Sequence, residues 1–139
     1  MKPFVTLGVL LINACAYVPT EKINLKSSVM AKEVINSPET GTFAPKNVTN
    51  EFSIDDPIIN VFATVSWDNV NSGAGVKEIR WEWYTDDRLV SKINAKFIFH
   101  TTPFSILGNI PTHILGKGNH SVKFYIENKE FSSNGFIVK

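Results

Sequence analysis

Three segments of this chain carry an apolar residue at every second position, which is the side-chain period of a β-strand rather than of a helix. The longest runs from Ile59 to Trp67, and the others run from Ile79 to Trp83 and from His120 to Ile126. Polar residues fill most of the intervening positions, so each segment has one apolar face. We therefore expect strands that bury one face in a shared core.

Turn sequences separate these strands at short intervals. Residues 69–75 and 116–118 are rich in Gly and Asn, which tolerate the backbone angles that turns need. Asp86 and Asp87 mark a further turn, and an irregularity near 133–135 would bring both phenylalanines of the last strand to the core. The pattern predicts an all-β, antiparallel β-sandwich of about seven strands over residues 51–139.

A tryptophan occupies the middle strand of this domain, and a Gly-x-Gly-x-His-x-Val-x-x-Tyr pattern follows it, formed by Gly116, Gly118, His120, Val122 and Tyr125. On these features the segment resembles the immunoglobulin-like domains of bacterial envelope proteins, although the immunoglobulin cysteine pair is absent. The resemblance implies an immunoglobulin-like sandwich. That fold supports many functions and assigns none by itself.

The N-terminal residues have the layout of a secretory signal. Lys2 supplies a positive charge, residues 4–12 form an uncharged apolar run, and small Ala14 precedes Cys15, the single cysteine. This layout resembles the signal of bacterial lipoproteins, whose lipobox ends in a small residue and a cysteine that receives the lipid. The resemblance implies a signal peptide over residues 1–14 and a lipidated, palmitate-bearing Cys15. The alternative is a buried strand in which Cys15 packs as a small hydrophobe.

The same resemblance bears on location. The apolar run is about half of the roughly 20 residues that a membrane-spanning helix requires, so the lipid would be the anchor. Ala16 stands where lipoproteins retained at the inner membrane of Gram-negative bacteria carry an aspartate. We therefore expect a lipid-anchored protein of the bacterial cell envelope, at the outer membrane.

Residues 16–50 are rich in Lys, Ser, Thr, Asn, Glu and Pro, which favours a flexible tether. Four residues at near-helical spacing leave open a short helix over residues 21–34: Ile23, Ser27, Met30 and Val34. A flexible coil of about 35 residues spans roughly 30–35 Å, enough to hold a domain clear of lipid headgroups. The expected division is a signal peptide at 1–14, an anchor and tether at 15–50, and the sandwich at 51–139.

Charge and cysteine content bear on two further properties, which are nucleic-acid binding and stabilisation by disulfides. Cleavage would remove Lys2 and leave 13 basic and 13 acidic side chains. A neutral domain has no basic excess for nucleic acid. With Cys15 bound to lipid, no thiol would remain for a disulfide, so packing alone would stabilise the fold.

We expect no catalytic residues, no metal site and no cofactor other than the lipid. The chain has no Gly-x-Ser-x-Gly nucleophile elbow. The spacing of His100, His113 and His120 matches no short metal motif, and His120 falls on an apolar face where a hydrogen-bonded core histidine is expected. Residues 68–73 cannot form an EF-hand loop because Val70 occupies a ligand position, which leaves a plain turn or another calcium loop.

Aromatic residues divide between the two strand faces. Those in phase with the apolar face are expected in the core: Trp67, Trp81, Trp83 and Phe124. Three others lie out of phase: Phe62, Tyr84 and Tyr125. If their strands are neighbours, these three would form an exposed binding patch with Arg80 and Lys123, suited to sugar stacking or to a protein interface. Coverage by loops or by residues 16–50 is the alternative.

These features predict a non-catalytic, membrane-anchored lipoprotein that docks onto another envelope protein or assembly. The alternative is a carbohydrate- or peptidoglycan-binding module that uses the exposed aromatic face. Docking is preferred because sugar platforms usually expose tryptophan, and the tryptophans here are expected inside.

Lipidation of Cys15 is directly testable. We expect the intact mass of protein extracted from membranes to match a chain that begins at Cys15 and carries three acyl groups. An unprocessed Met1 together with a free thiol would contradict the prediction.

Overall fold

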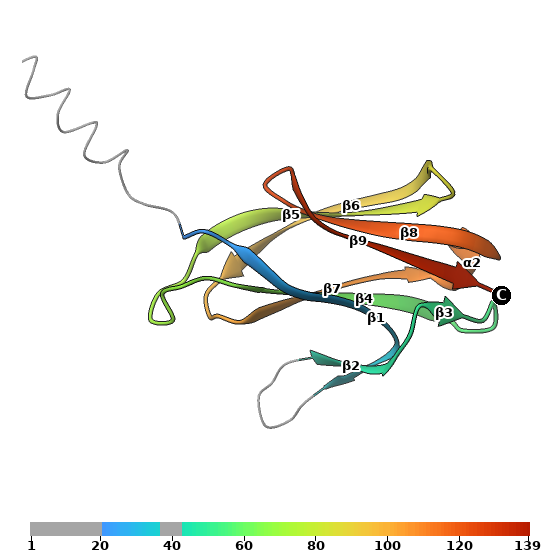
Figure 1. Ribbon diagram of the computed structural model, residues 1–139, viewed down its shortest axis with the longest axis horizontal. Coiled ribbons are helices and arrows are strands. Elements are labelled where there is room, and N and C mark those ends of the chain that lie inside the picture. The colour runs from blue at the N-terminus through green and yellow to red at the C-terminus, as the bar shows by residue number, and fades with distance from the viewer. Residues whose placement is uncertain (1–20, 37–42) are drawn as a thin grey trace, which may run out of the picture.

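A computed structural model of the protein describes residues 21–36 and 43–139, which fold into two sheets stacked face to face (Figure 1). The elements of the described residues are β1 (Asn24–Asn36), β2 (Phe43–Val48), β3 (Glu51–Phe52), β4 (Ile58–Ser66), β5 (Gly75–Thr85), β6 (Arg88–Phe99), β7 (Phe104–Pro111), α2 (Thr112–Leu115), β8 (Gly118–Ile126) and β9 (Lys129–Val138). One sheet has the order β2-β1-β4-β7 and the other the order β3-β9-β8-β5-β6. The prediction of an all-β sandwich is confirmed.

The three alternating segments are interior strands, each with a paired strand on both sides. Their apolar faces form the core between the sheets, where Ile59, Trp83 and Phe124 are completely buried. Burying side chains of this size contributes about 2–3 kcal/mol each, which is the main stabilising term in a sandwich. The four aromatic residues predicted for the core all lie there.

The expected tether is wrong for much of its length, because residues 24–36 and 43–48 are strands of the four-stranded sheet. The helix considered for residues 21–34 is wrong for the same reason. β1 pairs antiparallel with β4, which places Met30 opposite Val61 in the core. The sandwich therefore begins near residue 24 rather than 51. Residues 51–139 form seven strands, as predicted, and β1 and β2 add two more among the described residues.

The alternation of apolar residues did not predict β1, for two physical reasons. Its register with β4 shifts between Leu25 and Ser27, and a bulge of this kind breaks the period of two. Ser28 also occupies a core-side position, where its hydroxyl donates to Asn134 Oδ1 of β9 at 2.6 Å. Because a hydrogen-bonded polar residue can stand at a core-side position, the alternation of apolar and polar residues is interrupted there.

The last strand pair has the predicted irregularity, at a slightly earlier position. Tyr125 pairs with Glu130 and Phe124 with Ser132, so Phe131 is the extra residue of the bulge. Phe131 packs against the core, and Phe136 is buried. The shift lies two residues before the predicted stretch 133–135.

The second half of β1 leaves β4 and forms a hairpin with β2. β1 pairs with β4 up to Ala31 and with β2 from Ala31 to Asn36. This hairpin runs along the outer side of the four-stranded sheet, away from the other sheet (Figure 1). β4 therefore has neighbours on both of its faces, and its outward residues Asn60 and Phe62 are buried.

The two sheets make a close contact where Trp81 of β5 faces Gly108 of β7. A Cβ atom added at Gly108 would lie 2.7 Å from Trp81 Cε2 and 2.8 Å from Nε1, inside van der Waals contact. The ring of Trp81 also packs on Phe124, with 4.3 Å between the ring centroids. Glycine is therefore required at position 108 for its missing side chain.

We predict that Gly108→Ala lowers the free energy of unfolding by about 1–3 kcal/mol, because the new methyl group overpacks the site against Trp81. Urea denaturation followed by tryptophan fluorescence measures this change. The control is Gly135→Ala in β9, where an added Cβ meets no atom within 4 Å. Equal stability of the two variants would contradict the contact.

Candidate functional site

The outer face of the five-stranded sheet carries four of the five residues predicted for a binding patch. Arg80 and Tyr84 project from β5, and Lys123 and Tyr125 project from β8. β5 and β8 pair so that Arg80 lies opposite Tyr125, and Glu82 lies opposite Lys123. The condition set for the patch, that its strands are neighbours, is therefore met for β5 and β8.

Glu82 is the centre of this outer-face cluster. Its carboxylate accepts a hydrogen bond from Arg80 Nε at 2.7 Å and one from the Tyr84 hydroxyl at 2.5 Å. A second guanidinium nitrogen of Arg80 donates to Asn128 Oδ1 at 2.7 Å. Arg80 and Glu82 are largely buried, with 17% and 12% of their side-chain surfaces exposed, so the ion pair is held in one geometry.

A cationic side chain lies over each of the two tyrosine rings of the cluster. The Arg80 guanidinium carbon lies 4.1 Å from the centroid of Tyr125, and Lys123 Nζ lies 5.3 Å from that of Tyr84. Cations over aromatic faces are attracted by the ring quadrupole, so these contacts stabilise the surface. A ring face covered in this way is not free to stack on a sugar.

The cluster also shifts the ionisation of its members. The hydrogen bond to Glu82, with burial, raises the pKa of Tyr84 to about 12. Burial alone would raise the pKa of Glu82, but the hydrogen bonds from Tyr84 and Arg80 and the charge of Arg80 outweigh burial and lower it. Burial and the negative charge of Glu82 raise the pKa of Tyr125. These shifts mark a satisfied structural network.

Phe62, the fifth predicted patch residue, does not belong to this surface, and its assignment is wrong. It lies on β4, in the other sheet, and only 3% of its surface is exposed. Val29 of β1 and Leu107 of β7 lie beside it in register. Val29 belongs to residues 16–50, so the burial of Phe62 favours the alternative from the sequence, coverage by part of that segment.

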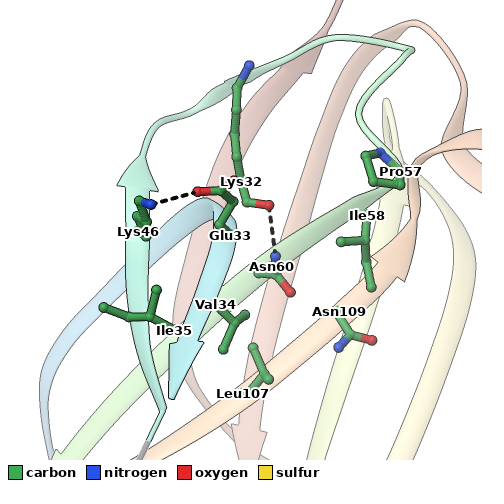
Figure 2. A pocket seen from close by; sticks show the side chains of 10 residues that line it. All are labelled: Lys32, Glu33, Val34, Ile35, Lys46, Pro57, Ile58, Asn60, Leu107 and Asn109. Atoms are coloured by element: carbon green, nitrogen blue, oxygen red, sulfur yellow. Dashed lines mark hydrogen bonds and ion pairs between the residues drawn. The ribbon is translucent and has the colours of Figure 1, made fainter. Parts of the chain in front are cut away.

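An open groove separates the β1–β2 hairpin from the outer face of the four-stranded sheet (Figure 2). Its volume is about 640 Å³, and Val34 on the hairpin faces Leu107 on the sheet across it, whereas Ile35 projects to the other side of β1. At one end Lys46 Nζ lies 3.7 Å from Glu33 Oε2. The amide of buried Asn60 donates to the carbonyl oxygens of Ala31 and Lys32, each at 3.3 Å, which fixes the place where the hairpin leaves the sheet. The groove offers apolar and polar contacts but no grouped nucleophile and base.

A second exposed surface lies along β6, which sequence reasoning did not identify. Ten large hydrophobic residues of the described part are exposed. Half of them lie on β5 and β6: Val76, Leu89, Ile93, Phe97 and Ile98. Among the described residues β6 is the last strand of its sheet, with no strand beyond it. The signal in the sequence is the run from Lys92 to Phe99, where basic and apolar residues are interleaved.

The histidine and loop predictions concern residues away from these surfaces. His120 is buried, its Nε2 donates to the Gly116 carbonyl at 2.8 Å, and its Nδ1 is hydrogen-bonded with Thr85 Oγ1 at 3.0 Å. It is a hydrogen-bonded core histidine, as predicted.

In the 68–73 loop, Asn69 Oδ1 accepts a hydrogen bond from the Asn71 backbone amide at 3.0 Å, which is a turn contact. Within residues 21–36 and 43–139, no three His, Cys, Asp or Glu side chains gather as metal ligands would.

The signal sequence and Cys15 lie outside the described residues, so lipidation stays a prediction. In the part of the chain that the structure covers, no helix has the length and apolar character to cross a bilayer.

Comparison with known proteins identifies the fold. No family model matches the chain, and no curated protein matches it. An immunoglobulin-like protein from Pseudomonas aeruginosa is similar with a TM-score of 0.52 and 10% identity, over 88% of this chain and 100% of that one. A β-glucosidase from Listeria innocua is similar with a TM-score of 0.51 and 14% identity, over 88% of this chain and 18% of the enzyme's. At such identities the likeness shows the fold alone, and the chain is an immunoglobulin-like β-sandwich.

We predict that Glu82→Gln lowers the pKa of Tyr84 from about 12 toward its ordinary value of 10.0, because the charged acceptor is lost. Carbon NMR of labelled tyrosines, titrated with base, measures it. Folding raises this pKa, so the stability it contributes is complete below about pH 10 and is lost as the pH rises through about 12.

Glu130→Gln is the control, since Glu130 contacts Tyr125 and Lys123 rather than Tyr84. A pKa of Tyr84 that stays near 12 in the Glu82 variant would refute the assigned cause.

Proposed function

We propose that this chain is a non-catalytic binding module of the bacterial cell envelope, anchored through a lipid on Cys15 and docked onto another envelope protein. The observation that carries the proposal is the β6 edge of the five-stranded sheet, where Ile93 and Phe97 stay exposed on the core side and Val76 and Ile98 are exposed as a pair on the outer face. Apolar side chains grouped on a protein surface are typical of interaction sites. An immunoglobulin-like sandwich is a suitable rigid support for such a surface.

The position of β1 refines how the anchor would act. β1 begins at Asn24, only nine positions after Cys15. A chain extends by at most about 3.6 Å per residue, so the lipidated cysteine would lie within about 32 Å of the first strand. The proposed anchor therefore restricts the sandwich to partners close to the membrane surface. This limit is tighter than that of the expected tether of about 35 residues, whose full extension at the same rise would be about 126 Å.

The arrangement of aromatic residues favours a protein partner over a glycan. The glycan alternative needs Phe62, Tyr84 and Tyr125 on one exposed face, and Phe62 is buried in the other sheet. The rings of Tyr84 and Tyr125 carry Lys123 and Arg80. The exposed apolar residues near β6 have no such cover, and they suit contact with a protein.

Co-purification from native membranes tests the proposal. We expect the full chain, cross-linked before detergent extraction, to retain a defined envelope protein in fixed ratio. The Cys15→Ala variant should lose both the membrane fraction and most of that partner, because the partner would meet the module only at the membrane. A full chain that is lipidated but partnerless after cross-linking would contradict docking.

A further inference from the structure

β6 is a long strand with one open edge. It has 12 residues, and β5 is its single strand neighbour within the part of the chain that the structure describes (Figure 1). An edge strand presents unpaired backbone N–H and C=O groups, which form a template for one more strand. Most of its side chains are exposed, so the template is accessible along the strand.

The core-side face of β6 is only partly covered. Ile93 pairs with Trp81 and Phe97 with Lys77, so both apolar side chains point to the core side of the sheet. Even so, 47% of Ile93 and 40% of Phe97 is exposed. The cause lies in the opposite sheet, which ends at β7, where Gly108 already faces Trp81 of β5. β6 therefore overhangs the core at Ile93 and Phe97, whereas Ala95 between them packs against the core and Phe99 is completely buried.

The outer face of β6 carries positive charge. Lys92 lies opposite Glu82 and Lys96 lies opposite Glu78 in the register with β5. Glu82 is already bound to Arg80 and Tyr84. Among the described residues, neither lysine has a carboxylate oxygen within 4.0 Å. Both ammonium groups are thus available to an acidic partner.

We propose that β6 accepts an extended segment of a partner protein as a sixth strand, and that this segment alternates acidic with apolar residues. Since side chains of a strand alternate between faces, its acidic residues would lie beside Lys92 and Lys96. Its apolar residues would lie beside Ile93 and Phe97 and cover the overhang. The inference rests on the proposed docking function and names the surface and the partner's chemistry.

The lysines also argue against a second copy of this chain as the occupant. Two β6 strands paired edge to edge would bring Lys92 and Lys96 of both copies onto the same face of one seam. Like charges placed across neighbouring strands are destabilising. Lysines on an edge strand commonly prevent self-pairing, and the same charges attract an acidic strand. The proposal differs from a purely protective role in requiring that an acidic strand bind.

Two synthetic peptides test the inference, one alternating glutamate with valine and the other alternating lysine with valine. Calorimetry with the purified full chain should detect binding of the glutamate peptide only. In Lys92→Glu/Lys96→Glu the dissociation constant of that peptide should rise by about tenfold or more, and the lysine peptide should now bind. The charge-matched control is Lys22→Glu/Lys26→Glu, two exposed lysines of which Lys22 lies just before β1 and Lys26 within it, and this variant should bind like wild type.

Amide hydrogen exchange with the glutamate peptide bound locates it, and protection should rise along β6 but not along the edge strands β2 and β7. No binding of the glutamate peptide, equal binding of both peptides, or protection spread over all edges would overturn the inference. Concentration-dependent dimerisation through β6 would overturn it in favour of a second copy. Circular dichroism confirms that each charge variant is folded.

Membrane co-purification of Lys92→Glu/Lys96→Glu separates this inference from the docking proposal. If the variant loses the envelope partner that wild type retains, the β6 edge is supported. If it keeps that partner, β6 is the wrong surface although docking stands. If wild type has no partner but binds the glutamate peptide, the strand-accepting edge is supported and the docking proposal fails.

Discussion

The contact between Trp81 and Gly108 sets how closely the two sheets approach, and the rest of the sandwich is arranged around it. The chain has a single cysteine and so no disulfide within it, which leaves packing of the sheet faces as the main stabilising interaction. Trp81 fills the space over Gly108 and packs on Phe124. Because β7 is the last strand of its sheet, this contact also marks where the core ends and where β6 begins to overhang.

The surface properties of the two outer faces follow from what covers them. On the four-stranded sheet, the β1–β2 hairpin covers part of the outer face, buries Asn60 and leaves the groove near Leu107. On the five-stranded sheet, no strand of residues 21–36 and 43–139 lies over β5 and β8. There Glu82 is the centre of a network of arginine, lysine and tyrosine side chains that bind one another. The first face offers a groove, whereas the second has most of its polar groups already paired. The edge at β6 combines unpaired backbone N–H and C=O groups with exposed apolar side chains and with Lys92 and Lys96, which form no ion pair among the described residues.

Sequence reasoning was strongest where a strand has one buried face and no irregularity. The alternation in β4, β5 and β8 predicted the core and the outer-face neighbours Arg80, Tyr84, Lys123 and Tyr125. It failed for β1, where a bulge and the inward Ser28 interrupt the period. It failed for Phe62 because a period of two cannot tell an exposed outer face from one that other strands cover. The β6 overhang could not be predicted either, since it depends on the number of strands in the opposite sheet.

The most direct test of a docked edge strand compares amide hydrogen exchange of the full chain in native membranes with exchange of the same chain purified in detergent. We predict that amides along β6 exchange slowly in membranes and rapidly after purification, while interior strands such as β4 exchange slowly in both. Equal exchange of β6 in the two preparations, with a partner still bound in the membranes, would contradict the assignment of β6 as the docking surface.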